Sequence, residues 1–432
     1  MNMTNEKVSN KWTKKQVLVL TGLWLAFLIS FITRLVWATL MPTVNSAMHF
    51  SVSQGNWYVT AFYIGYTITV LPGGMLADKI GYRKMVLFTV IGNCVAMSLM
   101  GFMQGYWSGL AFRFILGLVS GPDLAACMGV IGEWFSAKQR ATATGIFTTC
   151  TSFGLTVVNL YAPTVSQRYG WRSAMFVTAL IPLVVLGFVA YSLKGQPPYR
   201  LIKKNVQVAD ANKESSIVML KKAVTNRNVL LLAVTGLCAT GAKWGVTNWA
   251  NLFIVSSLGF SVVTAGKVMA LFGITSVISM VIAGWVSDHS RMSRHMLSAI
   301  FMAIFTPTII GFALSPKGNL GMLYFWAGAL GVGAFMFSSL TNTLSVEVAP
   351  TELRGTVVGF VNVFNQAGSF LAPMLLGSLL TATGSYVTSF LVISVFPLIG
   401  FVALLFIREG NKNTKKSTVN VQSQPNLVST KH

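Results

Sequence analysis

Twelve long apolar segments dominate this chain and leave few folds open to it. A bilayer core about 30 Å thick requires roughly 20 apolar residues in a helix, and every segment reaches that length. We therefore predict an all-α membrane protein whose transmembrane helices span residues 16–41, 53–77, 84–104, 107–135, 141–164, 173–193, 228–255, 263–287, 296–315, 320–345, 355–380 and 386–407.

The composition excludes other classes of protein. Charged residues make up 10% of the 432 residues, far below the roughly 25% of an ordinary soluble domain, which excludes a soluble multi-domain enzyme. A hydrophobic content of 53% excludes a disordered chain. The four cysteines lie in apolar segments without C-x-x-C spacing, so we predict neither a disulfide framework nor a metal site.

Basic residues lie almost entirely on one side of the predicted membrane. The termini, the central loop and the loops on their side carry 25 Lys and Arg residues, whereas the opposite loops carry Arg168, Arg172 and Lys317. Because cytoplasmic loops are enriched in Lys and Arg, both termini are predicted to be cytoplasmic. The same asymmetry accounts for the net charge of +22 without a nucleic-acid partner.

The predicted organisation is two six-helix halves joined by a cytoplasmic loop. Its parts are a cytoplasmic N-terminus (1–15), a first half (16–193), the central loop (194–227), a second half (228–407) and a disordered cytoplasmic tail (408–432). The compact loops favour a bacterial inner-membrane protein. The partners predicted by this organisation are the lipid bilayer and a small-molecule substrate, with the chain acting as a monomer.

The two halves repeat a set of charged landmarks. Asp78 and Asp288 follow the second and eighth segments, and Arg34 and Lys243 lie inside the first and seventh. Glu133 and Glu347 each precede an arginine, Arg140 or Arg354, by seven residues. The four offsets fall between 209 and 214 residues, which indicates a duplication. Duplicated halves are typical of secondary transporters, in which substrate binds between the halves near the midplane.

Two motifs resemble the major facilitator superfamily. Residues 74–84 read Gly-Met-Leu-Ala-Asp-Lys-Ile-Gly-Tyr-Arg-Lys, similar to the signature loop of that superfamily. Residues 113–121 match the Arg-x-x-x-Gly pattern of its fourth span. The resemblance implies twelve helices that move by alternating access. The Gly-Pro-rich motif of many drug antiporters is missing from 141–164.

Within that superfamily, three segments resemble the organophosphate:phosphate antiporters and the related organic anion symporters. They are residues 34–42, 243–249 and 347–360. In the antiporters, two basic residues hold the substrate phosphate, and the matching positions here are Arg34 and Lys243. The chain differs from the antiporters at Val70 and Thr151, where they carry Lys and His. It differs from the carboxylate symporters at Thr33 and Ser120, where they carry acids.

Charged side chains inside apolar segments are costly, so each is a candidate functional residue. At 1.5 Å per residue, Arg34 lies about 27 Å and Lys243 about 22 Å along their helices. We expect the pair to converge on one anion, where Arg can form two parallel hydrogen bonds. Aromatic and amide side chains near the pair are candidate pocket residues: Trp37, Tyr63, Tyr66, Asn159, Tyr161, Trp244, Asn248, Asn362, Asn365 and Gln366.

Asp123 is the one acid well inside a segment, directly after Gly121-Pro122. Burial disfavours a charged carboxyl and a nearby arginine favours it, so Asp123 could exchange a proton during transport. The alternative is a fixed counter-ion for Arg113 or Arg34. Arg113 has two open roles: handling of protons or substrate in the cavity, and bonding to carbonyls of neighbouring helices.

Charged residues at the predicted cytoplasmic helix ends can form ion-pair clusters that close the inner side. We assign this gating role to Asp78, Arg83, Glu133, Arg140, Asp288, Glu347 and Arg354. The alternative is that they only determine topology.

The predicted function is import of a small organic anion, favoured as a carboxylate, by proton symport. No nucleotide-binding G-x-x-x-x-G-K-[ST] motif and no catalytic constellation occur, so we expect neither an ATP-driven pump, nor a cofactor, nor an enzyme. Three alternatives stay open: exchange of an organophosphate for phosphate, drug efflux, and a membrane sensor that resembles a transporter but does not transport.

Overall fold

The computed structural model describes residues 12–198, 221, 225–290, 292–348 and 354–407, except the side chains of residues 137, 138, 141, 288, 339 and 354–356. Within these residues it contains twelve helical stretches long and apolar enough to cross a membrane, and no strand. The all-α, twelve-span prediction is therefore confirmed.

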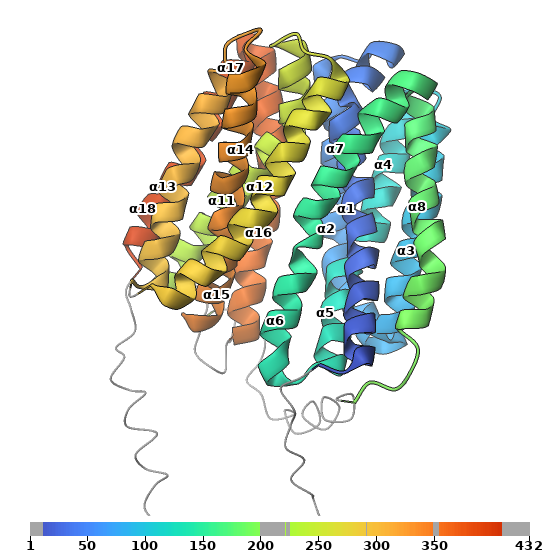
Figure 1. The fold of residues 1–432 in the computed structure, drawn as a ribbon, viewed down its shortest axis with the longest axis vertical. Helices are drawn as coiled ribbons and strands as arrows, with labels where there is room; N and C mark the ends of the chain where they lie inside the picture. The colour runs from blue at the N-terminus through green and yellow to red at the C-terminus, as the bar shows by residue number, and fades with distance from the viewer. Residues whose placement is uncertain (1–11, 199–220, 222–224, 291, 349–353, 408–432) are drawn as a thin grey trace, which may run out of the picture.

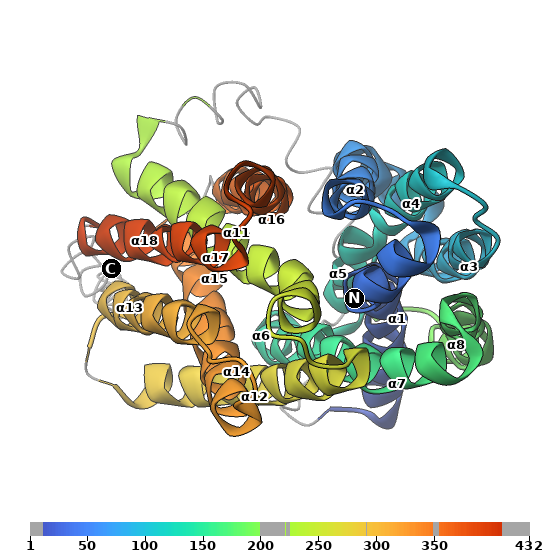
Figure 2. The same cartoon turned by 90° about the horizontal axis from the view of Figure 1, so that it is seen from above.

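The first half is formed by the helices α1 (Lys14–Met48), α2 (Val52–Ile80), α3 (Tyr82–Gly101), α4 (Tyr106–Ser120), α5 (Asp123–Trp134), α6 (Ala137–Thr148), α7 (Cys150–Tyr169) and α8 (Trp171–Ser192). The second half is formed by α11 (Arg227–Ser256), α12 (Val262–His289), α13 (Arg294–Ala313), α14 (Leu320–Met336), α15 (Ser338–Glu347), α16 (Arg354–Thr383), α17 (Tyr386–Ile393) and α18 (Val395–Leu405). Figure 2 shows the two halves as separate groups of helices. The beginning of α1 and the end of α18 lie at the same end of the bundle (Figure 1), which we call the terminal face; the other end is the opposite face.

The segment predicted at 107–135 is two helices, α4 and α5, separated at Gly121 and Pro122. Proline has no backbone N–H, so the carbonyl four residues earlier loses its usual donor. That carbonyl belongs to Leu118, and the hydroxyl of Thr69 in α2 donates to it at 2.8 Å. The break therefore costs no unsatisfied backbone group, and it starts a new helix at Asp123.

The second half breaks at the equivalent place without a proline. The segment predicted at 320–345 divides into α14 and α15 at Phe337, so that α15 begins at Ser338, 215 residues after the start of α5. The segments predicted at 141–164 and 386–407 are also each two helices, α6–α7 and α17–α18, and these breaks have no counterpart in the other half. The repeated break indicates a feature inherited by both halves.

Glycines allow one pair of helices in each half to approach closely. A Cβ on Gly117 of α4 would lie 2.1 Å from the backbone oxygen of Phe62 in α2. A Cβ on Gly331 of α14 would lie 2.3 Å from the backbone oxygen of Phe272 in α12. Small residues at such contacts let transmembrane helices pack backbone to backbone. The same contact at offsets of 214 and 210 residues extends the duplication from charged landmarks to packing.

Neutral polar groups connect the two halves near the opposite face. Asn56 of α2 donates to the backbone oxygen of Pro373 in α16 at 3.0 Å, and its own side-chain oxygen accepts from the indole of Trp249 in α11 at 3.2 Å. Asn159 of α7 accepts from Thr39 of α1 at 3.2 Å and from Asn251 of α11 at 3.0 Å. These contacts are buried, so the halves are tightly joined at this face.

We predict that Gly117→Ala destabilises the fold, because the added methyl group meets a backbone atom that cannot move aside. Overpacking of this kind costs about 1–3 kcal/mol. The measurement is the apparent melting temperature in detergent. Gly187→Ala in α8 is the matched control, since a Cβ there has no neighbour within 4 Å; equal melting temperatures for the two variants would contradict the close-packing argument.

Candidate functional site

A cavity of about 260 Å³ lies between the two halves. Arg34 and Tyr66 line it from the first half, and Lys243 and Trp244 line it from the second. Its other lining residues lie on the parts of α6, α7, α11, α15 and α16 nearer the terminal face. Because the contacts at the opposite face are closed, the cavity extends toward the terminal face.

Arg34 is a buried guanidinium surrounded by aromatic rings. Its central carbon lies 4.6 Å from the ring centroids of Phe31 and Tyr66, and 5.1 Å from that of Phe62. The side chain is 6% exposed, its Nε has no hydrogen-bond partner, and it forms no ion pair with a carboxylate among the described residues. Ring faces stabilise a desolvated cation but do not neutralise it, so Arg34 retains positive charge for a ligand.

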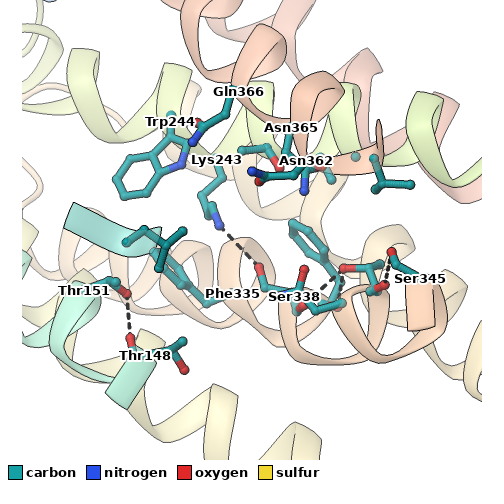
Figure 3. Close-up of a pocket in the computed structure, with 18 of the residues that line it drawn as sticks. Thr148, Thr151, Lys243, Trp244, Phe335, Ser338, Ser345, Asn362, Asn365 and Gln366 are labelled. Carbon is teal, nitrogen blue, oxygen red and sulfur yellow. Dashed lines mark hydrogen bonds between the residues drawn. The ribbon is translucent and has the colours of Figure 1, made fainter. Parts of the chain in front are cut away.

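Lys243 is the second cation of the cavity. Its ammonium nitrogen lies 3.4 Å from the hydroxyl of Ser338, at the start of α15, and about 5 Å from the rings of Trp244 and Phe335. Figure 3 shows its side chain extending into the space between α11 and the α14–α15 break. The ion pairs of the described residues do not include Lys243. Both halves therefore contribute one cation without an acidic partner.

The two walls of the cavity differ in polarity. The first half adds mainly apolar and aromatic groups to Arg34. The second half surrounds Lys243 with neutral hydrogen-bonding groups, many of them visible in Figure 3: Thr235, Thr240, Ser338, Thr341, Asn342, Ser345, Asn362, Asn365 and Gln366. Such a wall can bind hydroxyl or carbonyl groups of a ligand whose charged end lies at the cations.

Seven of the predicted pocket and anion-binding residues line the cavity: Arg34, Tyr66, Lys243, Trp244, Asn362, Asn365 and Gln366. The others lie outside it, held by packing contacts. Trp37 donates to the Gly55 carbonyl and stacks on Tyr58, while Tyr161 bonds to Thr178. Asn159 joins the halves at the opposite face, and Tyr63 packs behind Arg34, next to Asn248.

Asp123 does not line the cavity, although its neighbour Leu124 does. It is fully buried at the first turn of α5, where a helix N-terminus favours a negative charge. Its Oδ1 accepts from Thr89 of α3 at 3.2 Å, and its Oδ2 has no partner in the described part of the chain. Arg34 lies close enough to attract it electrostatically, but without an ion pair.

Arg113 bonds to the backbone of α1. Its Nη1 donates to the Thr33 carbonyl at 3.1 Å and its Nη2 to the Arg34 carbonyl, and the guanidinium lies over the ring of Phe62. It is 2% exposed and does not line the cavity. Of the two roles left open for it, the contacts support the bonding of neighbouring carbonyls.

The predicted gating residues make their contacts within their own halves. Asp78 accepts from Tyr82, and Arg83 reaches the Ala190 carbonyl at 3.5 Å. Arg140 donates to the carbonyls of Phe135 and Gly132 at 3.0 and 2.7 Å. Glu347 forms an ion pair with Arg294, which the sequence reasoning did not single out.

The remaining gating candidates are only partly visible. Glu133 lines a second cavity at the terminal face together with Arg83. The side chains of Asp288 and Arg354 lie outside the described residues. Over the described side chains, then, the gating candidates form no printed ion pair between the halves, as expected where the two halves are apart.

Comparison with known proteins decides the family. The sequence profile of the Major Facilitator Superfamily matches residues 23–373. The chain belongs to this superfamily. The superfamily resemblance is thereby confirmed, and so is the prediction that the protein is not an enzyme: it is a multi-pass membrane protein of a family of transporters.

Several relatives match over most of their length. The cis,cis-muconate transport protein of Acinetobacter baylyi is 25% identical, over 91% of this chain and 96% of the relative. The probable galactarate/D-glucarate transporter GudP of Bacillus subtilis is 24% identical, over 84% and 86%. The membrane sensor protein UhpC of Escherichia coli is 22% identical, over 92% and 93%.

A solved structure supports the fold. A bacterial homologue of the human lysosomal transporter Spinster, crystallised in an inward-facing and occupied conformation, superposes with a TM-score of 0.72. The match covers 91% of this chain and 97% of that one at 15% sequence identity, and we take it as evidence of fold alone.

Sequence reasoning missed the hydroxyl groups of α15 and the aromatic residues around Arg34. Phe31 and Phe62 look like ordinary lipid-facing or core residues in an apolar segment. Ser338, Thr341 and Ser345 recur at three- and four-residue spacing, which would place them on one helix face. That pattern was available, but only the break at Phe337 shows why the face lines the cavity.

We predict that Asn56→Ala loosens the opposite face, because it removes both hydrogen bonds that Asn56 makes to the second half. Spin labels at the exposed positions Trp107 and Leu320, at the opposite-face ends of α4 and α14, should report longer or broader distances. Ser378→Ala is the control, since that hydroxyl bonds only within α16. An unchanged distance distribution in Asn56→Ala would refute a closing role for these bonds.

Proposed function

We propose that this protein is a secondary transporter that imports a small organic anion, a carboxylate, by proton symport. The observation that carries the proposal is Arg34: a buried, cavity-lining guanidinium without a described acidic partner. A buried cation without a counter-ion is costly. An anionic substrate would supply that counter-ion at the point where the two halves meet.

The cavity supports a carboxylate that also carries hydrogen-bonding groups. A planar guanidinium matches a carboxylate through two parallel bonds. The second-half wall offers amides and hydroxyls that fit hydroxyl or further carboxylate oxygens, and Lys243 can attract a second negative charge. Relatives named as transporters of galactarate, D-glucarate and muconate support this class of substrate.

Proton coupling is assigned to Asp123, with the gating residues closing the terminal face in the other conformation. Asp123 is a buried acid with one oxygen unpartnered, close to Arg34 yet out of the cavity. A proton there and an anion at Arg34 would both reduce the same electrostatic strain. We further propose a monomer in a bacterial inner membrane, with the terminal face toward the cytoplasm as the positive charges suggest.

Three alternatives remain outcomes of experiment. Two cations in one cavity also suit exchange of an organophosphate for phosphate, although Val70 and Thr151 replace the basic groups expected for it. The same two cations disfavour cationic drugs. A sensor is the function printed for one relative, UhpC, so a protein that binds the anion without moving it is the second candidate.

We predict that Arg34→Ala abolishes uptake of labelled D-glucarate, D-galactonate or cis,cis-muconate into proteoliposomes under an inward proton gradient. Loss of one member of a buried ion pair costs about 3 kcal/mol or more, equivalent to roughly a hundredfold in kcat/KM. Arg34→Lys should recover only part, because an ammonium cannot form the paired bonds. Full uptake in Arg34→Ala would refute the assignment. Uptake by wild type only with phosphate inside would indicate exchange, and binding without uptake would indicate a sensor.

We predict that Asp123→Asn separates transport from the proton gradient. An amide mimics the protonated carboxyl, so exchange of labelled for unlabelled anion should continue, while accumulation driven by the gradient should fall to the equilibrium level. The measurement is the ratio of internal to external D-glucarate, D-galactonate or cis,cis-muconate, with and without the gradient. Cys127→Ser, which alters a neighbour of Asp123 without removing its charge, is the control. Gradient-driven accumulation by Asp123→Asn would exclude the coupling role.

A further inference from the structure

A buried polar network connects Asp123 with the helix that carries Arg34. It runs behind α1, outside the cavity, through Thr89 and Asn93 of α3 to Thr33 of α1. Every one of these side chains is 2% exposed or less. A buried polar group is retained only where it is hydrogen-bonded, and this network is almost fully satisfied.

Asn93 is the centre of the network. Its side-chain oxygen accepts two hydroxyls, from Thr33 of α1 and Ser120 of α4, both at 3.0 Å. Its amide nitrogen donates to the Thr89 carbonyl at 2.8 Å, one turn earlier in α3. The single side chain therefore joins α1, α3 and α4, and it lies one hydroxyl away from Asp123 of α5.

Two hydroxyls of the network have a choice of acceptor. Thr89 can donate to Asp123 at 3.2 Å or to the Val86 carbonyl at 2.9 Å. Thr33 can donate to Asn93 at 3.0 Å or to a carbonyl of its own helix at 3.1 Å. Each hydroxyl has one hydrogen, and an ionised carboxylate is the stronger acceptor. The charge on Asp123 therefore selects the position of the Thr89 hydrogen.

Thr33 is also the residue before Arg34, and their two carbonyls are held by Arg113. A change in the Thr33 hydrogen bond thus acts on the backbone from which the Arg34 side chain extends. We infer that Asn93 is a positioning residue that transmits the protonation state of Asp123 to Arg34. The inference rests on the proposed function, in which these two residues bind the proton and the anion.

The direct alternative is electrostatic attraction between Asp123 and Arg34 through space. The ionisable groups that interact with Asp123 are Arg34 of α1, Cys127 of its own helix and Cys150 of α7. The cysteines add no positive charge, so Arg34 is the cation that a direct effect would involve. A direct effect does not need Asn93, and this difference makes the two explanations separable.

The test measures the reactivity of Arg34 without any transported anion. Purified protein is treated with p-hydroxyphenylglyoxal at fixed pH, and modification of Arg34 is followed by peptide mass spectrometry. Asp123→Asn should raise the rate by roughly threefold, the scale of coupling between residues of one network, because the neutral residue releases Thr89 and leaves the Arg34 segment less restrained. In the Asn93→Leu background, the same substitution should leave the rate unchanged.

Two matched variants remove one hydroxyl each from the same oxygen of Asn93. Thr33→Val breaks the path to α1 and should abolish the effect of Asp123→Asn, whereas Ser120→Ala leaves that path intact and should preserve it. If the effect of Asp123→Asn persists in Asn93→Leu and Thr33→Val, the attraction is direct and the inference is wrong. If Asp123→Asn has no effect on Arg34 in wild type, the inference is also wrong.

Thr178→Val controls for a loss of stability. Thr178 is a buried hydroxyl of the same half, bonded to Tyr161 and outside the network. It should lower the melting temperature without changing the response of Arg34 to Asp123→Asn. Because no anion is present, failure here leaves the proposed transport intact, while failure of Arg34→Ala to abolish uptake would refute the transport proposal with this network unaffected.

Discussion

A positive charge without a counter-ion, buried at the contact between two halves, sets the physical problem that this protein must solve. Arg34 is desolvated and surrounded by the rings of Phe31, Phe62 and Tyr66, with Lys243 on the other wall of the same cavity. In a low-dielectric interior such charge is tolerable only while something compensates it. Ring faces, the nearby Asp123 and water from the terminal face provide partial compensation, and a bound anion would complete it.

The rest of the architecture divides the work between two faces. At the opposite face the halves are joined by neutral amides, indole and glycine contacts, which need no change of charge to form or break. At the terminal face the charged residues pair inside their own halves. The break that starts α5 at Asp123 recurs where α15 starts at Ser338, so each half ends a helix at the level of the cavity. One half uses the new helix start for an acid, the other for a hydroxyl beside Lys243.

The candidate site was predictable where a single residue type carried the signal. Arg34 and Lys243 were identified because a charge in an apolar segment is rare, and Asn362, Asn365 and Gln366 because they share a helix face. Trp37, Tyr161 and Asn159 were chosen on proximity in sequence, yet each has its polar atom engaged in packing or in the contact between halves. Asparagine and aromatic residues serve both purposes, and their partners are distant in sequence.

The amino-acid sequence by itself determined the twelve apolar spans, the duplication and the excess of positive charge on one side, since each follows from local composition and spacing. It also located the costly charges, because no partner is needed to recognise them. Only the tertiary structure decided which of those charges share a cavity, which face is closed and what lies behind Arg34. Those outcomes depend on how helices far apart in the chain pack, as Asn93 does against Thr33 and Ser120, and no periodicity within one helix records its neighbours.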